Sequence, residues 1–149
     1  MRIYMDVCCY NRPMDDQTQE RIRIEAGAIT RILQNCVEKG WDLIGSIVVE
    51  YELNNHTDKI KQREAFKIYN YAKIIYNIFD YPDAKYRANE FQLLGVGAMD
   101  SLHLAISECA EVDILLTTDD RFINTAKRSN SKVRVVNPTV WCEEVFNNE

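Results

Sequence analysis

Four short, mostly apolar segments, separated by longer stretches of helical pattern, restrict the fold of this chain more than any other feature. They are "RIYMDV" at residues 2–7, "WDLIGS" at 41–46, "DILLTT" at 113–118 and "VRVV" at 133–136. Strands that are nearly continuous apolar runs are typical of a parallel sheet whose two faces are both covered by helices. We therefore predict an α/β fold, an α/β/α sandwich with a central parallel sheet flanked by helices on both faces.

Between these strands, apolar residues recur at the three-to-four-residue spacing of an amphipathic helix. The predicted helices cover residues 17–39, a segment that starts after Ser46, and residues 57–79, 82–94, 100–110 and 119–128, with a last short helix from Pro138. We interpret residues 57–94 as a helical insert. A chain of 149 residues with 46% hydrophobic residues has the size of one domain, so a single domain over residues 1–149 is expected.

Composition restricts the setting in which the protein works. No run of 18 apolar residues occurs, and the short apolar N-terminus is interrupted by Asp6, so we expect a cytoplasmic protein. Five cysteines without a CxxC pair argue against a zinc site or a disulfide framework. The net charge of −5 argues against binding nucleic acid by bulk electrostatics, but it allows a protein whose acids are neutralised by bound metal.

Acidic residues follow the predicted strands in several places. Asp6 follows the first strand, Glu50 and Glu52 follow the second, and Asp119 and Asp120 follow the third. In "GVGAMDSLHLA", Asp100 stands where a helix begins, which is a favoured position for a capping carboxylate. Because functional groups of an open parallel sheet gather beyond the carboxyl ends of its strands, we expect these acids to meet at one edge.

Clustered carboxylates need compensation, since like charges a few ångströms apart raise one another's pKa. An oxygen-rich site without converging His or Cys suits Mg²⁺ or Mn²⁺, which often complete their coordination with phosphate oxygens. Such a metal activates water and stabilises charge during displacement at phosphorus. The pattern therefore predicts metal-dependent hydrolysis of phosphodiester bonds.

The segments "IYMDVCCY", "SIVVEYEL", "GAMDSLHLAIS" and "ILLTTDDRF" resemble, in this order, the four acidic motifs of PIN domains, the metal-dependent ribonuclease fold of VapC-type toxins. The resemblance implies that Asp6, Asp100 and Asp119 are catalytic metal ligands. In the second motif the family's acid commonly stands six residues after the Ser that ends the strand, which favours Glu52 and leaves Glu50 as the alternative. On a helix these two side chains point about 200° apart, so they do not both face one metal easily.

The fourth motif also assigns roles around Asp119. Thr117 matches the family's hydroxyl residue two positions before the acid, and it is expected either to hydrogen-bond a ligand carboxylate or water, or simply to end the strand. Asp120 is expected to cap the next helix or to lie behind the ligands.

The resemblance further implies an RNA substrate, a homodimer and a small antitoxin protein, none of which composition shows. The insert is rich in tyrosine and carries seven Lys/Arg against four Asp/Glu over residues 56–89, a net of about +3 (7 − 4). Tyrosine and arginine can stack on unpaired bases, although a helical hairpin with packed tyrosines and solvated lysines explains the same pattern. The candidate substrate-binding residues are Arg12, Lys59, Arg63 and Lys67.

Other interpretations remain. A phosphoaspartyl or receiver-type domain also keeps acids at strand ends, but "MDVCC" provides neither a second Asp two residues after the first nor a paired acid. A catalytically silent PIN-like module that binds RNA or protein is weakened by the presence of all four acids. "GVG" lacks the third glycine of a dinucleotide fingerprint. Ser101 and His103 have no orienting acid and are interpreted as residues on a helix face, with a place near the acids left open for His103.

Overall fold

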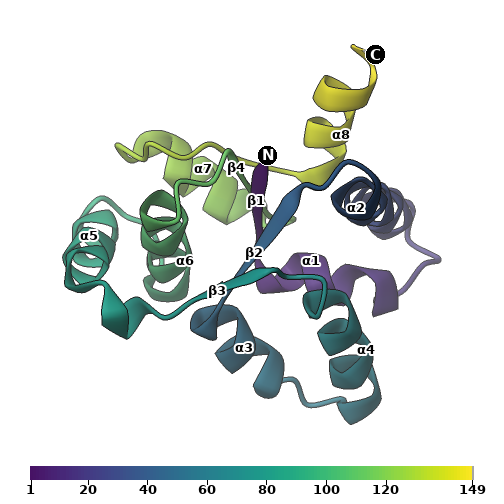
Figure 1. Cartoon of the computed structure of the whole chain (residues 1–149), viewed down its shortest axis with the longest axis horizontal. Coiled ribbons are helices and arrows are strands. Elements are labelled where there is room, and N and C mark those ends of the chain that lie inside the picture. Colours follow the sequence, from purple (N-terminus) through teal and green to yellow (C-terminus); the bar gives the residue numbers. More distant parts are fainter. Residues whose placement is uncertain (149) are drawn as a thin grey trace.

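The computed structural model describes residues 1–148, in which five parallel strands form one sheet between helices (Figure 1). The strands are β1 (Arg2–Met5), β2 (Asp42–Ser46), β3 (Ile74–Tyr76), β4 (Ile114–Leu116) and β5 (Val135–Val136), in the spatial order β3-β2-β1-β4-β5. The α-helices are α1 (Val7–Asn11), α2 (Glu20–Glu38), α3 (Ile47–Asn54), α4 (Lys59–Tyr69), α5 (Pro82–Leu93), α6 (Ala98–Cys109), α7 (Asp120–Arg128) and α8 (Pro138–Phe146). Two 3₁₀ turns, η1 (Arg12–Met14) and η2 (Ile78–Asp80), complete the elements. The predicted α/β fold is confirmed.

Helices cover both faces of the sheet. In Figure 1, α5, α6 and α7 lie on one side of the strands and α1, α2 and α4 lie on the other. The helices α1 and α3 begin where β1 and β2 end, so that both start at the carboxyl edge of the sheet. In the described residues, no helix is both long enough and apolar enough to cross a membrane.

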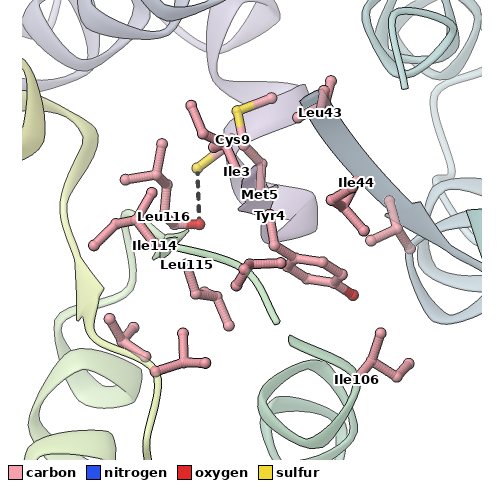
Figure 2. Close-up of a cluster of buried hydrophobic side chains, with 14 of the residues drawn as sticks. Ile3, Tyr4, Met5, Cys9, Leu43, Ile44, Ile106, Ile114, Leu115 and Leu116 are labelled. Carbon is pink, nitrogen blue, oxygen red and sulfur yellow. Dashed lines mark hydrogen bonds between the residues drawn. The ribbon is translucent and has the colours of Figure 1, made fainter. Parts of the chain in front are cut away.

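The central strand β1 lies inside the core. Its residues Ile3, Tyr4 and Met5 are fully buried, and their Cα partners are Leu43 and Ile44 of β2 on one side and Ile114–Leu116 of β4 on the other. Figure 2 shows these side chains together with Cys9 of α1 and Ile106 of α6, and marks the Cys9 thiol, which donates to the Leu116 carbonyl at 3.4 Å. A strand buried on both faces is apolar at nearly every position, which is why its sequence shows no alternation.

The prediction of a helix over residues 57–79 is wrong in its second half. The helix α4 ends at Tyr69, and Ile74–Tyr76 form the edge strand β3, which pairs with Ile44–Ser46 of β2. The apolar positions of this segment fit a helical period, but the free edge of β2 offers backbone hydrogen bonds that the period does not reveal. The segment 57–94 is therefore not a purely helical insert, because it supplies a strand of the central sheet.

The start of α6 also differs from expectation. The N-cap is Gly97, and Asp100 is the third helical residue rather than the cap. Its carboxylate still lies in the first turn, where the helix dipole favours negative charge.

Gly45 of β2 allows Tyr69 and Ile75 to pack closely on the strand. A Cβ atom at Gly45 would lie 2.7 Å from the Tyr69 hydroxyl oxygen and from Ile75 Cδ1, so we expect Gly45→Ala to lower the free energy of unfolding by about 1–3 kcal/mol. A Cβ atom added at Gly27 in α2 would have no other atom within 4 Å. We therefore expect Gly27→Ala to raise the free energy of unfolding by about 0.5–1 kcal/mol. Urea denaturation followed by circular dichroism measures both. A Gly45→Ala variant as stable as the wild type would contradict this packing.

Candidate metal centre

Three side chains from distant parts of the sequence converge at the carboxyl edge of the sheet. One ligand atom from each of Asp6, Glu52 and His103 lies within 4.8 Å of the other two. Asp6 follows β1, Glu52 lies on α3 and His103 lies on α6. The group joins two of the predicted acids to His103, for which the sequence left a place near the acids open.

Asp6 is buried and held from two sides. Its carboxylate caps α1 by accepting a hydrogen bond from the Val7 N–H at 2.7 Å, and it accepts another from the Thr117 hydroxyl at 2.9 Å. The Cys8 thiol is 3.5 Å from the same carboxylate. These contacts fix the side chain at the end of β1, where a buried carboxylate requires hydrogen bonds.

Ser46 determines which glutamate of α3 faces the cluster. Its hydroxyl caps α3 by accepting from the Val49 N–H at 3.2 Å, which sets the start of the helix. Glu52 then contacts His103, whereas Glu50 accepts a hydrogen bond from the Tyr69 hydroxyl at 3.0 Å. The structure thus brings Glu52, and not Glu50, into the cluster.

His103 lies fully buried among polar groups. Its Nε2 contacts a Glu52 carboxylate oxygen and lies 3.4 Å from Asp6 Oδ1, while its Nδ1 lies 2.5 Å from the Tyr4 hydroxyl. The Tyr4 hydroxyl is in turn 2.8 Å from the Ser46 hydroxyl. Tyr4 and Ser46 therefore support both His103 and the start of α3.

Opposing effects act on the pKa of His103. Burial lowers this pKa, but the hydrogen bond to Glu52 and the nearby charges of Asp6 and Glu52 raise it more, so the pKa lies above its usual value. The raised pKa favours the protonated imidazole, a form that donates from both nitrogens, to Glu52 and to the Tyr4 hydroxyl oxygen. Burial raises the pKa of Tyr4 well above its usual value, which keeps its own proton available for Ser46.

Asp100 stands on the same helix as His103, three residues earlier, and is half-buried. Burial and the negative charge of Asp6 raise the pKa of Asp100 to about 6, with smaller upward contributions from Asp119 and Glu52 and a downward contribution from His103. This electrostatic coupling links Asp100 to every other predicted acid. The i, i+3 spacing to Asp100 is the sequence signal that could have placed His103 in the site.

Asp119 is exposed and lies at the start of α7. Its Oδ1 accepts the cap hydrogen bonds of Arg121 N–H at 2.9 Å and Phe122 N–H at 3.3 Å. Its backbone N–H donates to the Thr117 hydroxyl oxygen at 3.1 Å. Since the same hydroxyl donates to Asp6, Thr117 connects the acids of the first and fourth motifs.

Asp120 does not cap α7, contrary to one expectation, because Asp119 occupies the N-cap position. The Asp120 carboxylate instead accepts two hydrogen bonds of 2.9 Å from the guanidinium of Arg21, which lowers its pKa. It is thus bound outside the cluster formed by Asp6, Glu52 and His103.

The predicted substrate-binding cations are placed differently from one another. Arg12 donates to the Thr118 hydroxyl at 2.6 Å and to Asp15 at 3.1 Å, so its guanidinium is engaged within the protein. Lys67 pairs with Glu64 at 2.8 Å on α4. Lys59 and Arg63 are exposed on the same helix.

The donor set suits a hard divalent cation. The carboxylate oxygens of Asp6, Glu52, Asp100 and Asp119 are donors of the kind that Mg²⁺ and Mn²⁺ prefer, and burial together with the charge of Asp6 raises the pKa of Asp100. His103 also lies within the cluster, in the place near the acids that the sequence left open for it. There it contacts the Glu52 carboxylate, so the donors offered to a cation are the carboxylate oxygens.

No family model and no curated protein matches this sequence. The fold, however, is similar to a chain in the crystal structure of VapBC2 from Rickettsia felis bound to a DNA fragment from their promoter, with a TM-score of 0.61. The alignment covers 92% of this chain and 98% of that chain, at 12% sequence identity. This similarity is one of architecture, and it supports the PIN-like fold that the motifs implied.

The raised pKa of Asp100 predicts how its charge affects stability. Between the unfolded value near 3.8 and the folded value of about 6, the folded chain binds more protons at Asp100, so this group lowers stability as pH rises through that window. Without metal, Asp100→Asn should be more stable than the wild type at pH 7.5 by roughly 1 kcal/mol, after allowing for solvent screening, and this gain should shrink strongly at pH 4.

Urea unfolding in EDTA at the two pH values measures the difference. Mn²⁺ at pH 7.5 should then stabilise the wild type more than Asp100→Asn, because the variant has lost one ligand charge. If the wild type and Asp100→Asn differ in stability by the same amount at both pH values, the pKa of Asp100 is not raised by burial and its neighbours.

Proposed function

We propose that this chain is a Mg²⁺- or Mn²⁺-dependent endoribonuclease that hydrolyses RNA phosphodiester bonds. The observation that carries the proposal is the convergence of Asp6, Glu52 and His103 at the carboxyl edge of a PIN-like sheet, with Asp100 electrostatically coupled to them. Carboxylates at this edge stand where an α/β sheet presents its functional groups. Asp6, Glu52, Asp100 and Asp119 are proposed as the metal ligands.

A divalent cation bound by these acids would supply an activated water and a counter-charge for the phosphate oxygens. The residues around it have separate tasks. Thr117 orients Asp6 through its 2.9 Å hydrogen bond, and His103 orients Glu52. With a pKa of about 6, Asp100 is mostly ionised at pH 7.5 and is then able to bind a cation.

The proposed partners follow from the likeness to VapBC2. We propose that the chain is the toxin of a toxin–antitoxin pair in the cytoplasm, that a small antitoxin protein blocks its site, and that it forms a homodimer. A catalytically silent PIN-like module is the second candidate function. The first is favoured because the acids expected to bind metal converge and are supported by buried groups: Thr117 donates to Asp6, and the Tyr4 hydroxyl holds His103, which contacts Glu52.

The proposal predicts cleavage of single-stranded or structured RNA that requires a divalent metal. Wild-type protein should cut RNA with Mn²⁺, and EDTA should abolish the cleavage. Asp100→Asn, which keeps the size of the side chain, should lower the rate at saturating RNA by about 100-fold or more, because a ligand charge is lost. Gel analysis of end-labelled RNA measures the rate, and a silent binding module would bind RNA without cutting it. Cleavage that persists in EDTA and in the Asp100→Asn variant would contradict the proposal of a metal-dependent nuclease.

The two glutamates of α3 provide a matched pair. Glu52→Gln should reduce Mn²⁺-dependent cleavage by about 10–100-fold, since Glu52 faces the cluster. Glu50→Gln, two residues away, should retain most of the activity because Glu50 binds the Tyr69 hydroxyl instead. The opposite pattern, with activity lost only in Glu50→Gln, would assign the second-motif ligand to Glu50.

A further inference from the structure

A second buried carboxylate, Glu25 in the middle of α2, lies outside the acidic cluster. Its side chain is 2% exposed, and cationic or amide groups approach both of its oxygens. Arg12 Nε is 3.3 Å from Oε1, Arg21 Nε is 3.3 Å from Oε2, and the Asn137 side-chain amide donates to Oε2 at 2.5 Å. A single acid on an amphipathic helix gives no signal of a functional role, so the sequence predicts none for Glu25.

Both arginines reach from Glu25 to the loop between β4 and α7. Arg12 donates to the Thr118 hydroxyl at 2.6 Å, and Arg21 donates to the Thr118 carbonyl at 3.1 Å. Arg21 also binds both carboxylate oxygens of Asp120 at 2.9 Å. Thr118 and Asp120 are the two neighbours of Asp119, so the arginines contact the residues on each side of this acid, through the Thr118 hydroxyl and carbonyl and the Asp120 carboxylate.

Burying the Glu25 carboxylate beside Arg12 and Arg21 costs desolvation free energy, which indicates that the positions of these groups serve a purpose other than stability. A buried ion pair gains little stability over apolar residues of similar volume, since desolvation of the charges offsets their attraction. Glu25 nevertheless occupies a buried position in α2, where Ala26, Ile29 and Ile32 are packed in the core. A carboxylate here does what an apolar residue cannot: it accepts a hydrogen bond from Arg21 and attracts the guanidinium of Arg12 as an ion pair.

Asp119 needs such support more than the other acids do. Asp6 is buried at the end of the central strand, and Glu52 is held by His103, but Asp119 is exposed on a loop. Asp119 itself bonds to the first turn of α7 and to Thr117. The other contacts that hold the loop are made by its neighbours Thr118 and Asp120. Misplacement of a ligand by less than an ångström weakens a metal site.

We propose that Glu25 is a positioning residue of the metal centre: it aligns Arg12 and Arg21 against Thr118 and Asp120, and thereby holds Asp119 toward the cluster. The proposal rests on the proposed function in that Asp119 is a metal ligand. It also gives Arg12, predicted from sequence as a substrate contact, a role within the protein.

The test compares Mn²⁺ affinity, measured without RNA by electron paramagnetic resonance of the free ion. Glu25→Gln keeps the shape of the side chain and removes its charge, and it should weaken Mn²⁺ binding by about 5–10-fold, near the lower end for groups that orient a ligand. Glu38→Gln, at the exposed C-terminal end of the same helix, is the matched control and should bind Mn²⁺ like the wild type. Equal affinity in the two variants would overturn the proposal.

A double-mutant cycle with Asp119→Asn separates positioning from a general structural effect. If Glu25 acts through Asp119, Glu25→Gln should cause no further loss of Mn²⁺ affinity in the Asp119→Asn background. A loss of the same size in both backgrounds would overturn the proposal. If thermal melting shows that Glu25→Gln does not fold, Arg21→Gln replaces it, because the Arg21 side chain is 56% exposed and its removal leaves the core intact.

The RNA assay keeps the two proposals apart. A chain that binds Mn²⁺ and shows the Glu25–Asp119 coupling, yet cleaves no RNA, would refute the nuclease and retain the role of Glu25. A chain that cleaves RNA with unchanged Mn²⁺ affinity in Glu25→Gln would do the reverse.

Discussion

The pairing of β1 with β4 at their carboxyl ends is the constraint on which the rest of the site depends. Met5 lies opposite Leu116, and the Asp6 N–H donates to the Leu116 carbonyl at 2.9 Å. This register places the Asp6 carboxylate level with the Thr117 hydroxyl, which binds it. In the same register, Asp6 is the N-cap of α1, and the chain continues from β4 to Asp119, the N-cap of α7. A one-residue slip would turn every side chain of β1 to the opposite face.

The alternating direction of the side chains of β1 also places Tyr4 beneath the cluster of Asp6, Glu52 and His103. Successive side chains of a strand point to opposite faces of the sheet. Tyr4 therefore turns toward α6, where its hydroxyl lies between Ser46 and His103, while Ile3 and Met5 turn toward the other face. A phenol gives this position an apolar ring for the core and one polar atom for the site. The core and the candidate metal centre are thus joined at a single residue.

Sequence alone predicted those parts of the molecule that local chemistry determines. Ser46 ends β2 and its hydroxyl caps α3; the resemblance to the second motif favours Glu52, six residues after this Ser, and the structure places Glu52 in the cluster. The strand β3 could not be predicted in this way, because its three residues continue the apolar period of α4 and become a strand only through the open edge of β2.

His103 shows a different limit. Its i, i+3 spacing to Asp100 is the one local signal, but its contacts are with Tyr4 and Glu52, which are 99 and 51 residues away in sequence. The choice between Asp119 and Asp120 falls between these cases. The fourth motif assigns the ligand role to Asp119, whose backbone N–H donates to the Thr117 hydroxyl oxygen, but only the position of Arg21 explains where Asp120 points.

The residues of the candidate metal centre form two groups that differ in burial and in the contacts that hold them, an inner half and an outer half. Asp6, Glu52 and His103 are held by Tyr4, Ser46 and Thr117, which are buried and belong to the ends of central strands. Asp100 and Asp119 stand in the first turns of helices, closer to solvent, and Asp119 depends on contacts that lead back to Glu25. Since buried groups lose the most when a partner is removed, changes to the inner half act on folding and function together. Changes to Asp100 and Asp119, in contrast, are expected to act on the proposed metal affinity while the sheet stays intact.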